Sequence, residues 1–201
     1  NPQRECNMET PHPVPSDMNR VAVIGSTSSG KTTLAKSLAT ILGSVHIEMD
    51  ALRFLPGWKV RDNDDFRVKV SEATSQPRWV TDGNYSITRD LTWGRADTVI
   101  WLNYNLPLIL RRLTRRTFSR WWNRTELWNT GNRENLIKHF IPNDESLYFW
   151  VLKTYWKRRR ELPAIIARPE HAHLRFIIFT TPRETDLWLK AVERDYAKPI
   201  T

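Results

Sequence analysis

The stretch GSTSSGKTT, residues 25–33, constrains the fold of this chain more than any other feature. It satisfies the spacing G-x-x-x-x-G-K-[ST], in which glycines let the backbone turn so that successive N–H groups point at phosphate oxygens. The apolar, β-branched run RVAVI precedes it, and residues 31–42 follow with apolar side chains at helical spacing before Gly43. The sequence therefore predicts a buried strand, a phosphate-binding loop and a helix, in that order.

The phosphate-binding loop predicts which residues would hold a nucleotide. Lys31 is expected to reach the β- and γ-phosphates of ATP, and the hydroxyl of Thr32 is expected to bind Mg²⁺. The start of the following helix adds the positive end of its dipole to the same site. The loop residues predicted to bind the cofactor are Gly25, Ser26, Ser28, Ser29, Gly30, Lys31, Thr32 and Thr33. An ordinary Gly/Ser turn that matches the motif by chance is the alternative interpretation.

Strand-like and helix-like segments alternate along the rest of the chain. The runs SVHIEMD, RWVTDG, ADTVIWLN and LRFIIF read as strands, whereas NDDFRVKVSEATS and TPRETDLWLKAV read as helices. The last of these helices begins with a capping box formed by Thr181 and Glu184. The segment NLPLILRRLTRRTFSRW is expected to be a helix with Asn105 as its N-cap. This alternation predicts an α/β fold in which helices cover both faces of a parallel sheet.

Two carboxylates are expected at the ends of strands that neighbour the phosphate-binding loop. A magnesium-bound triphosphate needs such a carboxylate, and Asp82, in RWVTDG, is assigned to the metal, with a structural role in the turn as the alternative. Asp50 ends SVHIEMD, and ligands in such sheets bind at the carboxyl ends of strands. Two roles stay open for Asp50: a base or hydrogen-bond acceptor for an acceptor hydroxyl, or a polar cap on the loop that follows.

The basic charge is concentrated in one region. Residues 111–160 hold 13 Lys and Arg against 4 Asp and Glu, a surplus equal to the formal net charge of +9 for the whole chain. A kinase lid needs several arginines, because they stabilise the charge on a transferred phosphoryl group. Nucleic-acid binding also favours arginine beside aromatic rings, which stack on bases. We favour the lid, because the cluster follows the fourth strand, and we keep nucleic acid as the alternative.

The tryptophans of this region are expected to divide between packing and surface positions. Five of the ten tryptophans fall within residues 121–156. Trp150 and Trp156 lie among helical apolar residues and are expected to pack in the core or against other helices, whereas Trp121, Trp122 and Trp128 are less easily buried. The run KRRR, residues 157–160, is expected to be a solvated helix end.

The length and composition are those of one soluble domain. Of the 201 residues, 40% are hydrophobic and 26% are charged, and no apolar run approaches the roughly 20 residues that a membrane-spanning helix needs. The single cysteine, Cys6, cannot form an internal disulfide. We expect a cytoplasmic protein with a flexible N-terminal tail over residues 1–19. Residues 20–201 are expected to form a single domain that contains a lid segment at about residues 118–160.

Several motifs together resemble the P-loop kinases of the adenylate-kinase-like group. The nearest resemblance is to bacterial adenylate-kinase-related and DNA-topology-modulation-type P-loop proteins. The matching pieces are VAVIGSTSSGKTTLAKSLA, HIEMDALRFLPGW, WVTDGNYS, RADTVIWLN, RRTFSRWWNRTELWNTGNRENL and TTPRETDLWL, which cover most of residues 20–190 in order. The combination of D-x-L-x-F-x-P-G-W with D-G-N-Y is the most specific part of this resemblance.

The resemblance implies a P-loop NTPase fold with a five-stranded parallel sheet flanked by helices, ATP on the loop, and a helical lid rich in Arg and Trp. It implies that Arg112 and Arg116 lie one turn apart on the helix after the fourth strand, with Arg120 a further turn on the same face. It also places Arg124 in the lid and Arg183, in the loop TTPRE, beside the adenine. Adenylate kinases carry an arginine shortly after the D-G pair, whereas this chain reads DGNYS.

These features predict an enzyme, a P-loop kinase that moves the γ-phosphoryl group of Mg-ATP to a small acceptor. The acceptor class is a nucleotide, a nucleoside or a hydroxyl-bearing metabolite. The residues predicted to be catalytic are Lys31, Asp50, Arg112, Arg116 and Arg124, and those predicted to hold Mg²⁺ are Thr32 and Asp82. The alternative function is a nucleic-acid-associated P-loop NTPase or regulator that binds DNA or RNA through residues 111–160.

Overall fold

Strands and helices alternate along the chain. The computed structural model describes residue 10 and residues 12–123, 125–128, 130–133 and 146–197. The strands are β1 Arg20–Gly25, β2 Val45–Glu48, β3 Trp79–Asp82, β4 Thr98–Leu102, β5 Glu126–Leu127, β6 Asn132–Arg133 and β7 Arg175–Phe179. The α-helices are α1 Lys31–Leu42, α2 Met49–Arg53, α3 Asn63–Ala73, α4 Arg89–Arg95, α5 Leu106–Trp122, α7 Leu147–Ile166 and α8 Pro182–Tyr196.

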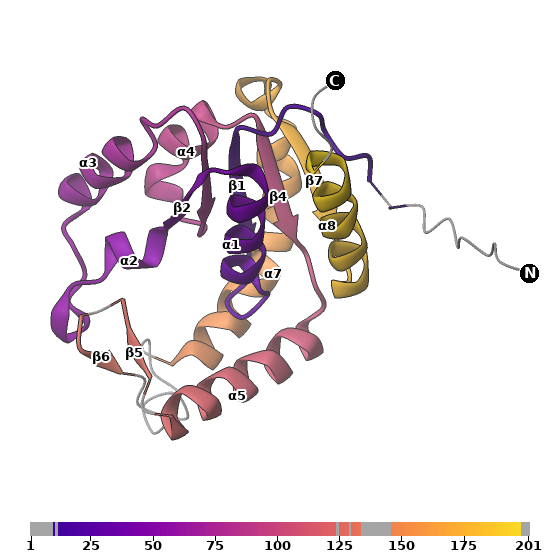
Figure 1. Cartoon of the computed structure of the whole chain (residues 1–201). Helices are drawn as coiled ribbons and strands as arrows, with labels where there is room; N and C mark the ends of the chain where they lie inside the picture. Colours follow the sequence, from indigo (N-terminus) through magenta and orange to yellow (C-terminus); the bar gives the residue numbers. More distant parts are fainter. Residues whose placement is uncertain (1–9, 11, 124, 129, 134–145, 198–201) are drawn as a thin grey trace, which may run out of the picture.

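Five strands form the central sheet, in the order β2-β3-β1-β4-β7 (Figure 1). Each neighbouring pair in this sheet is parallel. In the middle of the sheet, Val21 of β1 is in register with Val80 of β3 and Thr98 of β4. Because parallel strands end at the same edge, Gly25 and Asp82 lie on one side of the sheet. The predicted α/β fold, with a five-stranded parallel sheet flanked by helices, is confirmed.

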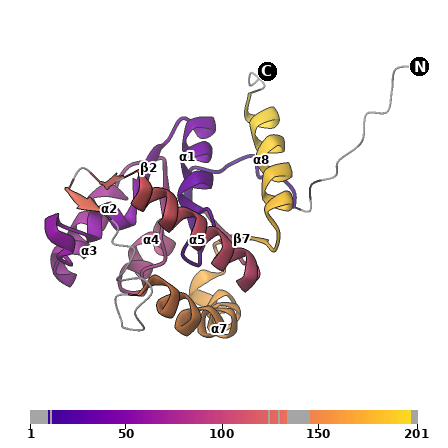
Figure 2. The ribbon, with the colours of Figure 1, turned by 90° about the horizontal axis from the view of Figure 1, so that it is seen from below.

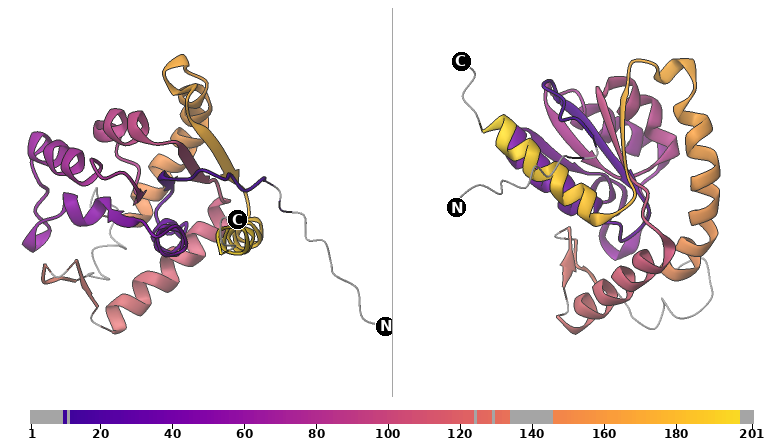
Figure 3. Two further views of the ribbon diagram at one scale, coloured as in Figure 1. Left: turned by 45° about the horizontal axis from the view of Figure 1, so that its top comes forward. Right: turned by 90° about the vertical axis from the view of Figure 1, so that its right-hand side faces the viewer.

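Helices cover both faces of the sheet, because successive side chains of a strand point to opposite faces. In β1, Val21 and Val23 belong to a core shared with α1, α5 and α8, whereas Ala22 and Ile24 belong to a second core shared with α3 and α4. The right panel of Figure 3 shows α1 and α8 on one side of the sheet and α7 on the other. A sheet buried on both faces accounts for the almost continuously apolar strands of the sequence.

Helix α5 crosses the edge of the sheet at which the strands end (Figures 1 and 2). It begins as predicted, because the side chain of Asn105 accepts a hydrogen bond of 3.0 Å from the N–H of Leu108. Pro107 stands in the first turn, where its missing N–H costs no hydrogen bond. Ile109 and Leu113 are buried, so the remaining faces of α5 carry its basic residues over the edge where ligands bind in such sheets.

The chain after α5 forms a two-stranded hairpin, β5 and β6, where the resemblance implied a helical lid. Gly131 has a φ of 74°, and its N–H donates a 2.7 Å hydrogen bond to the carboxylate of Glu126. The sequence WNTGN carries the signal for this turn, because Asn and Gly adopt left-handed backbone conformations easily. Figure 2 shows the hairpin beside α2. Arg124 and residues 134–145 of the predicted lid lie outside the described residues.

Strand β2 is shorter than the sequence predicts. It ends at Glu48, and the next five residues form α2, so Asp50 lies in the first turn of a short helix rather than at the end of a strand. Ile47 and Met49 are both buried, at 6% and 2% exposure. The alternation of buried and exposed residues therefore continues past the true end of the strand, which explains the difference.

The prediction that two tryptophans of α7 pack in the core is wrong. Trp150 and Trp156 are 44% and 61% exposed, and the side chains that pack are those of Val151 and Tyr155. Although α7 contains 20 residues, neither it nor any other helix in the described part of the chain is apolar enough over a sufficient length to cross a bilayer.

The described part of the predicted flexible tail packs against β7 and α8. Met18 is only 1% exposed and belongs to the core shared by α1 and α8. The indole N–H of Trp188 donates to the carbonyl of Pro13 (3.4 Å), and the hydroxyl of Tyr196 donates to the carbonyl of Pro15 (2.9 Å). The carbonyls of this segment have no partners within a helix or sheet, and side chains of α8 supply donors to two of them. Residues 12–19 are therefore part of the fold, contrary to the sequence-based prediction.

Candidate active site

The loop between β1 and α1 has the shape that its motif predicts. A Cβ atom added to Gly25 would lie 2.9 Å from the carbonyl oxygen of Leu102, so only glycine fits there. Gly30 and Ser28 have φ values of 99° and 61° in the left-handed region. The hydroxyls of Ser28 and Ser29 are buried and have no hydrogen-bond partner among the described residues. Buried polar atoms of this kind are costly unless a ligand satisfies them, which fits a loop that binds an anion.

Lys31 lies inside this loop. Its Nζ donates a 2.9 Å hydrogen bond to the carbonyl of Ser26. Burial lowers the pKa of Lys31 from 10.5 to about 8, although the nearby carboxylate of Asp50 acts in the opposite direction. A buried ammonium has lost its water, and phosphate oxygens would replace those lost hydrogen bonds. The burial of Lys31 is therefore what we expect of an ammonium group whose partner is a bound phosphate.

Thr32, Asp82 and His46 form one hydrogen-bonded chain at the end of β3. The hydroxyl of Thr32 donates to Oδ2 of Asp82 in a short hydrogen bond, and Nε2 of His46 lies 3.1 Å from Oδ1. Asp82 is 4% exposed. The two residues predicted to hold Mg²⁺ are thus in contact, and their oxygens are the ligand type that this ion prefers. No role was predicted for His46, which lies in β2 two residues before Glu48, the register partner of Asp82.

Three arginines of α5 line the same cleft, one helical turn apart. They are Arg112, Arg116 and Arg120. Nη1 of Arg112 donates a 2.8 Å hydrogen bond to the carbonyl of Ser29, and its guanidinium lies 5.4 Å from the ring centre of Tyr104. The charge of Arg116 acts on Lys31 and lowers its pKa. Arg111 and Arg115, the neighbouring row, are exposed. The structure therefore brings Arg112 and Arg116 to the phosphate-binding loop, as the resemblance implies.

A fourth arginine, Arg158 of α7, also reaches the loop. Its Nη1 donates a 3.4 Å hydrogen bond to the carbonyl of Gly25, and burial lowers the pKa of its guanidinium. Arg158 was predicted to lie in a solvated helix end, which is wrong for this residue. Helical spacing carries the missing signal, because Arg158 lies three residues after Tyr155 and seven after Val151, both of them buried.

Asp50 lies in the cleft and is held by a tyrosine. The hydroxyl of Tyr85 donates a 2.6 Å hydrogen bond to Oδ1 of Asp50. Burial, reinforced by the charge of Asp50, raises the pKa of Tyr85 far above its ordinary value, so Tyr85 remains a neutral donor. This contact orients one oxygen of the carboxylate toward Tyr85 and leaves Oδ2 available for a second contact. Tyr85 belongs to the DGNYS motif, but its role in holding Asp50 was not predicted.

The cleft has a volume of about 520 Å³ and joins the phosphate-binding loop to a cluster of rings. We call this cluster, formed by Phe54, Trp58 and Trp128, the aromatic wall. Phe54 and Trp58 belong to the loop after α2, whereas Trp128 belongs to the turn of the β5–β6 hairpin. Two carboxylates, Glu48 and Asp50, lie in the lining between the loop and the wall. The structure thus gives the cleft a basic side and an aromatic, acidic side.

The start of α8 forms the third side of the cleft, where the resemblance places adenine. Pro182 and Thr185 line it, and the side chain of Thr185 lies 2.6 Å from the hydroxyl of Tyr104. Arg183, which was predicted to bind the cofactor, is exposed and does not belong to the described lining. Successive helical residues point about 100° apart, so Arg183 faces away when its neighbours at 182 and 185 face the cleft.

The residues present fit Mg-ATP. The buried hydroxyls of Ser28 and Ser29 and the buried ammonium of Lys31 suit a polyphosphate, and the oxygens of Thr32 and Asp82 suit Mg²⁺. No cluster of three or more His, Cys, Asp or Glu side chains able to cage a metal occurs within the described residues. A magnesium ion that shares its ligands with phosphates and water needs only one or two protein oxygens.

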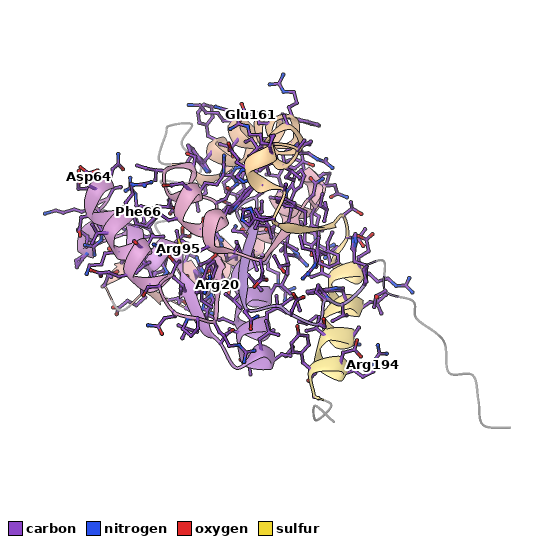
Figure 4. The ribbon with its side chains drawn as sticks, turned by 90° about the horizontal axis from the view of Figure 1, so that it is seen from above. Arg20, Asp64, Phe66, Arg95, Glu161 and Arg194 are labelled. Atoms are coloured by element: carbon purple, nitrogen blue, oxygen red, sulfur yellow. The ribbon has the colours of Figure 1, made fainter. Side chains whose placement is uncertain are left out.

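A second hollow lies at the opposite edge of the sheet, around Arg20 and Arg95, which Figure 4 labels. Nε of Arg20 donates to the carbonyl of Pro77 (3.3 Å), and Nη1 of Arg95 donates to the carbonyl of Ser71 (2.8 Å). These guanidinium groups fasten the last turn of α3 and the loop after it at the edge where the strands begin. Because ligands in such sheets bind where the strands end, we assign this hollow a structural role.

Comparisons with known proteins support the fold. No protein-family model matches the sequence, and no curated protein matches it. The structure is similar to shikimate kinase from Acinetobacter baumannii in complex with shikimate, with 20% identity, a TM-score of 0.50, and coverage of 92% of this chain and 96% of that chain. It is also similar to shikimate kinase from Bacteroides thetaiotaomicron, with 16% identity, a TM-score of 0.51, and coverage of 89% and 98%. At these identities the similarity shows a shared P-loop fold.

Proposed function

We propose that this chain is an ATP-dependent phosphotransferase that moves the γ-phosphoryl group of Mg-ATP to a small acceptor with a hydroxyl group. One observation carries the proposal: Lys31, the Thr32–Asp82 pair and three arginines of α5 converge on one cleft that also contains Asp50. The shared fold with shikimate kinases is consistent with this chemistry, and so is the resemblance of the quoted motifs to those of adenylate-kinase-related proteins.

The basic side of the cleft would hold the phosphates. Lys31 and Arg116 would contact the β- and γ-phosphates, and Arg158 would approach them from α7 because its guanidinium already lies against the carbonyl of Gly25. Arg112 would give up its bond to Ser29 for a phosphate contact. Arginines fixed around a transferred phosphoryl group stabilise the charge on its equatorial oxygens.

The acidic side would hold the acceptor. In the transfer step, the hydroxyl oxygen of the acceptor forms a bond to the γ-phosphorus, while the bond from that phosphorus to the bridging oxygen breaks and leaves its electrons on ADP. The hydroxyl proton passes to Oδ2 of Asp50, whose other oxygen Tyr85 holds. When bound at Thr32 and Asp82, Mg²⁺ supplies charge neutralisation on the β- and γ-phosphate oxygens.

The test is ADP release by the purified full chain from Mg-ATP, with and without a panel of small hydroxyl compounds. Lys31→Ala should abolish stimulation, and Arg116→Ala should reduce it by about 10² to 10³. Arg115→Ala is the matched control, because it removes the same charge from the exposed row of the same helix. If the chain does not bind Mg-ATP, or if Lys31→Ala binds and turns over like the parent, the proposal is wrong.

A second candidate function is a nucleic-acid-associated P-loop NTPase. The observation in its favour is a group of exposed rings at the end of α5, where Phe118, Trp121 and Trp122 are 54%, 44% and 71% exposed. Rings beside arginines suit single-stranded nucleic acid, whose bases stack on them. In that case DNA or RNA alone would stimulate ATP turnover, the stimulation would fall steeply with salt, and Arg115→Ala would weaken it as much as Arg116→Ala.

A further inference from the structure

The rings of the aromatic wall are arranged as one unit. Phe54 and Trp128 are stacked, with ring centres 5.5 Å apart and an interplanar angle of 10°. Trp58 meets both of them edge-on, with ring centres 5.8 Å from each. Trp58 remains 41% exposed, and all three rings line the same cleft as the phosphate-binding loop. A set of rings kept open toward a cleft is the usual lining of a site for a ring-bearing small molecule.

Backbone strain is concentrated around this cleft. Among the described residues other than glycine, three have left-handed φ values: Ser28 at 61°, Trp58 at 60° and Trp128 at 56°. All three line the cleft. A left-handed conformation is unfavourable for a bulky side chain and persists where surrounding contacts fix it, which happens most often at ligand-binding positions. Among the described residues other than glycine, a left-handed backbone therefore occurs only in the phosphate-binding loop and at the two tryptophans of the wall.

Hydrogen bonds hold the wall in place before any ligand arrives. The side chain of Asn132, which is 2% exposed, accepts a 2.9 Å bond from the N–H of Trp58 and donates a 3.0 Å bond to the carbonyl of Leu55. The indole N–H of Trp128 donates a 2.8 Å bond to Oε1 of Glu48. The hairpin is thereby fastened to the loop after α2 and to the end of β2. A wall fixed in advance loses little conformational entropy when it binds.

The charge beside the wall is negative. Glu48 and Asp50 lie in the lining, whereas the nearby arginines at 61 and 67 bind structural partners, the carbonyl of Leu52 and the carboxylate of Asp90. Arg53 donates to Asn63 and stacks over Phe66, the α3 residue labelled in Figure 4. Carboxylates accept hydrogen bonds from hydroxyls and repel other anions. This side of the cleft thus suits a ligand with hydroxyl groups and no negative charge.

We propose that the aromatic wall is the binding site for the phosphoryl acceptor, and that the acceptor is an uncharged ring that carries hydroxyl groups, as sugars and nucleosides do. The apolar face of the ring packs against Trp58 and Trp128, and its hydroxyls bind Glu48 and Asp50. This inference rests on the proposed phosphotransferase function. It distinguishes the chain from a kinase whose acceptor is itself a phosphate or a carboxylate.

The first experiment compares matched acceptors with the full chain and Mg-ATP. The neutral compounds are D-glucose, myo-inositol, adenosine and cytidine. The anionic counterparts are D-glucuronate, which keeps the pyranose ring, AMP and CMP, and glucosamine is the cationic compound. We expect kcat/KM for one neutral class to exceed that of its charged counterpart by about tenfold or more, with the phosphorylated product seen by phosphorus NMR. Comparison of the sugars with the nucleosides identifies the source of the ring.

The second experiment tests the wall with variants of one residue. Trp58→Gly removes the ring and suits the left-handed backbone, so the fold should not suffer. It should raise KM for the neutral acceptor about tenfold and leave the Kd for Mg-ATP within about twofold, and Trp58→Phe should restore much of the loss. Trp150→Ala is the matched control, because Trp150 is exposed to a similar extent, 44%, and lies outside the cleft lining.

Three outcomes would overturn the inference without touching the proposed function. The first is an anionic acceptor that is preferred and depends on Arg53, whose Nη1 is buried without a hydrogen-bond partner among the described residues, so that Arg53→Met loses it. The second is a preference for glucosamine alone. The third is Mg-ATP binding that depends on Lys31, with no neutral ring bound or phosphorylated. Failure to bind Mg-ATP would instead overturn the proposed function itself.

Discussion

The phosphate-binding loop at the centre of the nucleotide side is one continuous stretch of chain, residues 25–33, whereas the acceptor side joins segments that lie far apart in the sequence. In this loop the ligand meets mainly backbone turned by glycines, together with the buried ammonium of Lys31. On the acceptor side it meets side chains, of which Phe54 and Trp128 come from different segments and stack only in the folded chain. The nucleotide side is basic and the acceptor side is acidic.

This difference shows how one cleft can serve two ligands of opposite character. A loop of backbone N–H groups binds any polyphosphate, so it sets the cofactor class and leaves the acceptor unspecified. Side chains from separate segments must be placed individually, and here Asn132 places Trp58 while Glu48 places Trp128. The acceptor side can therefore change with few substitutions while the nucleotide side stays the same, as expected for folds that serve many functions.

The largest expected effect lies on the nucleotide side. Lys31→Ala removes the buried ammonium at the phosphates and should lower kcat by about 10³. Acceptor affinity, measured by equilibrium dialysis with the neutral ring, should change by less than about twofold. A large loss of acceptor binding in Lys31→Ala would mean that the two sides are not separate sites.

The next largest effect is expected at Asp50, where the acceptor side of the cleft meets the nucleotide side. Asp50→Asn keeps the shape of the side chain and removes its charge, so kcat should fall by about 10² if Asp50 takes the proton of the acceptor. Tyr85→Phe removes only the 2.6 Å bond that orients Asp50 and should cost about tenfold at most. Steady-state kinetics with the best acceptor measure both. Parental activity in Asp50→Asn would favour the other role left open by the sequence, a polar cap on the loop.

Between pH 7.5 and 9, the binding of Mg-ATP should depend on pH, whereas the binding of the acceptor should not. Burial lowers the pKa of Lys31 to about 8 in the free protein, and bound phosphates favour its protonated form. Mg-ATP binding should therefore take up a proton above pH 8, and the apparent Kd should weaken about tenfold between pH 7.5 and 9. Calorimetry in two buffers of different ionisation enthalpy measures the uptake. Lys31→Met should abolish it, and acceptor binding should show no such trend.

The smallest effect is expected from a change at Asn132, which supports the aromatic wall through hydrogen bonds. Asn132→Ala removes a side chain that bridges Trp58 and Leu55 and should raise the acceptor KM by about 3- to 10-fold through lost positioning. The Kd for Mg-ATP serves as the internal control and should not change. Equal losses on both sides would show that Asn132 supports the whole cleft rather than the wall.

The sequence predicts the nucleotide side well because its signals are local. The motif at residues 25–33 sets the loop, and helical spacing puts Arg112, Arg116 and Arg120 on one face of α5, as the structure shows. Asp82 was placed because it stands at the carboxyl end of a buried strand. These inferences need only a short window of sequence and the period of its secondary structure.

The acceptor side could not be predicted in the same way. The contact between Phe54 and Trp128 spans more than 70 residues of sequence, and no local pattern encodes it. His46 and Tyr85 acquire their roles from neighbours on other segments, Asp82 and Asp50. Arg158 is an intermediate case, because its helical spacing from Tyr155 was readable but its basic neighbours suggested a solvated helix end.

The packing of residues 12–19 also has a consequence for handling the protein. Strand β7 is an edge of the sheet, and an uncovered edge strand can pair with another molecule. Nε2 of His12 donates a 2.8 Å hydrogen bond to the carbonyl of Ile178, the last residue but one of that strand. A shortened protein that starts at Arg20 would lose this cover together with the buried side chain of Met18. We expect the shortened protein to self-associate through β7. Turbidity would reveal this association before any change in catalysis is measured.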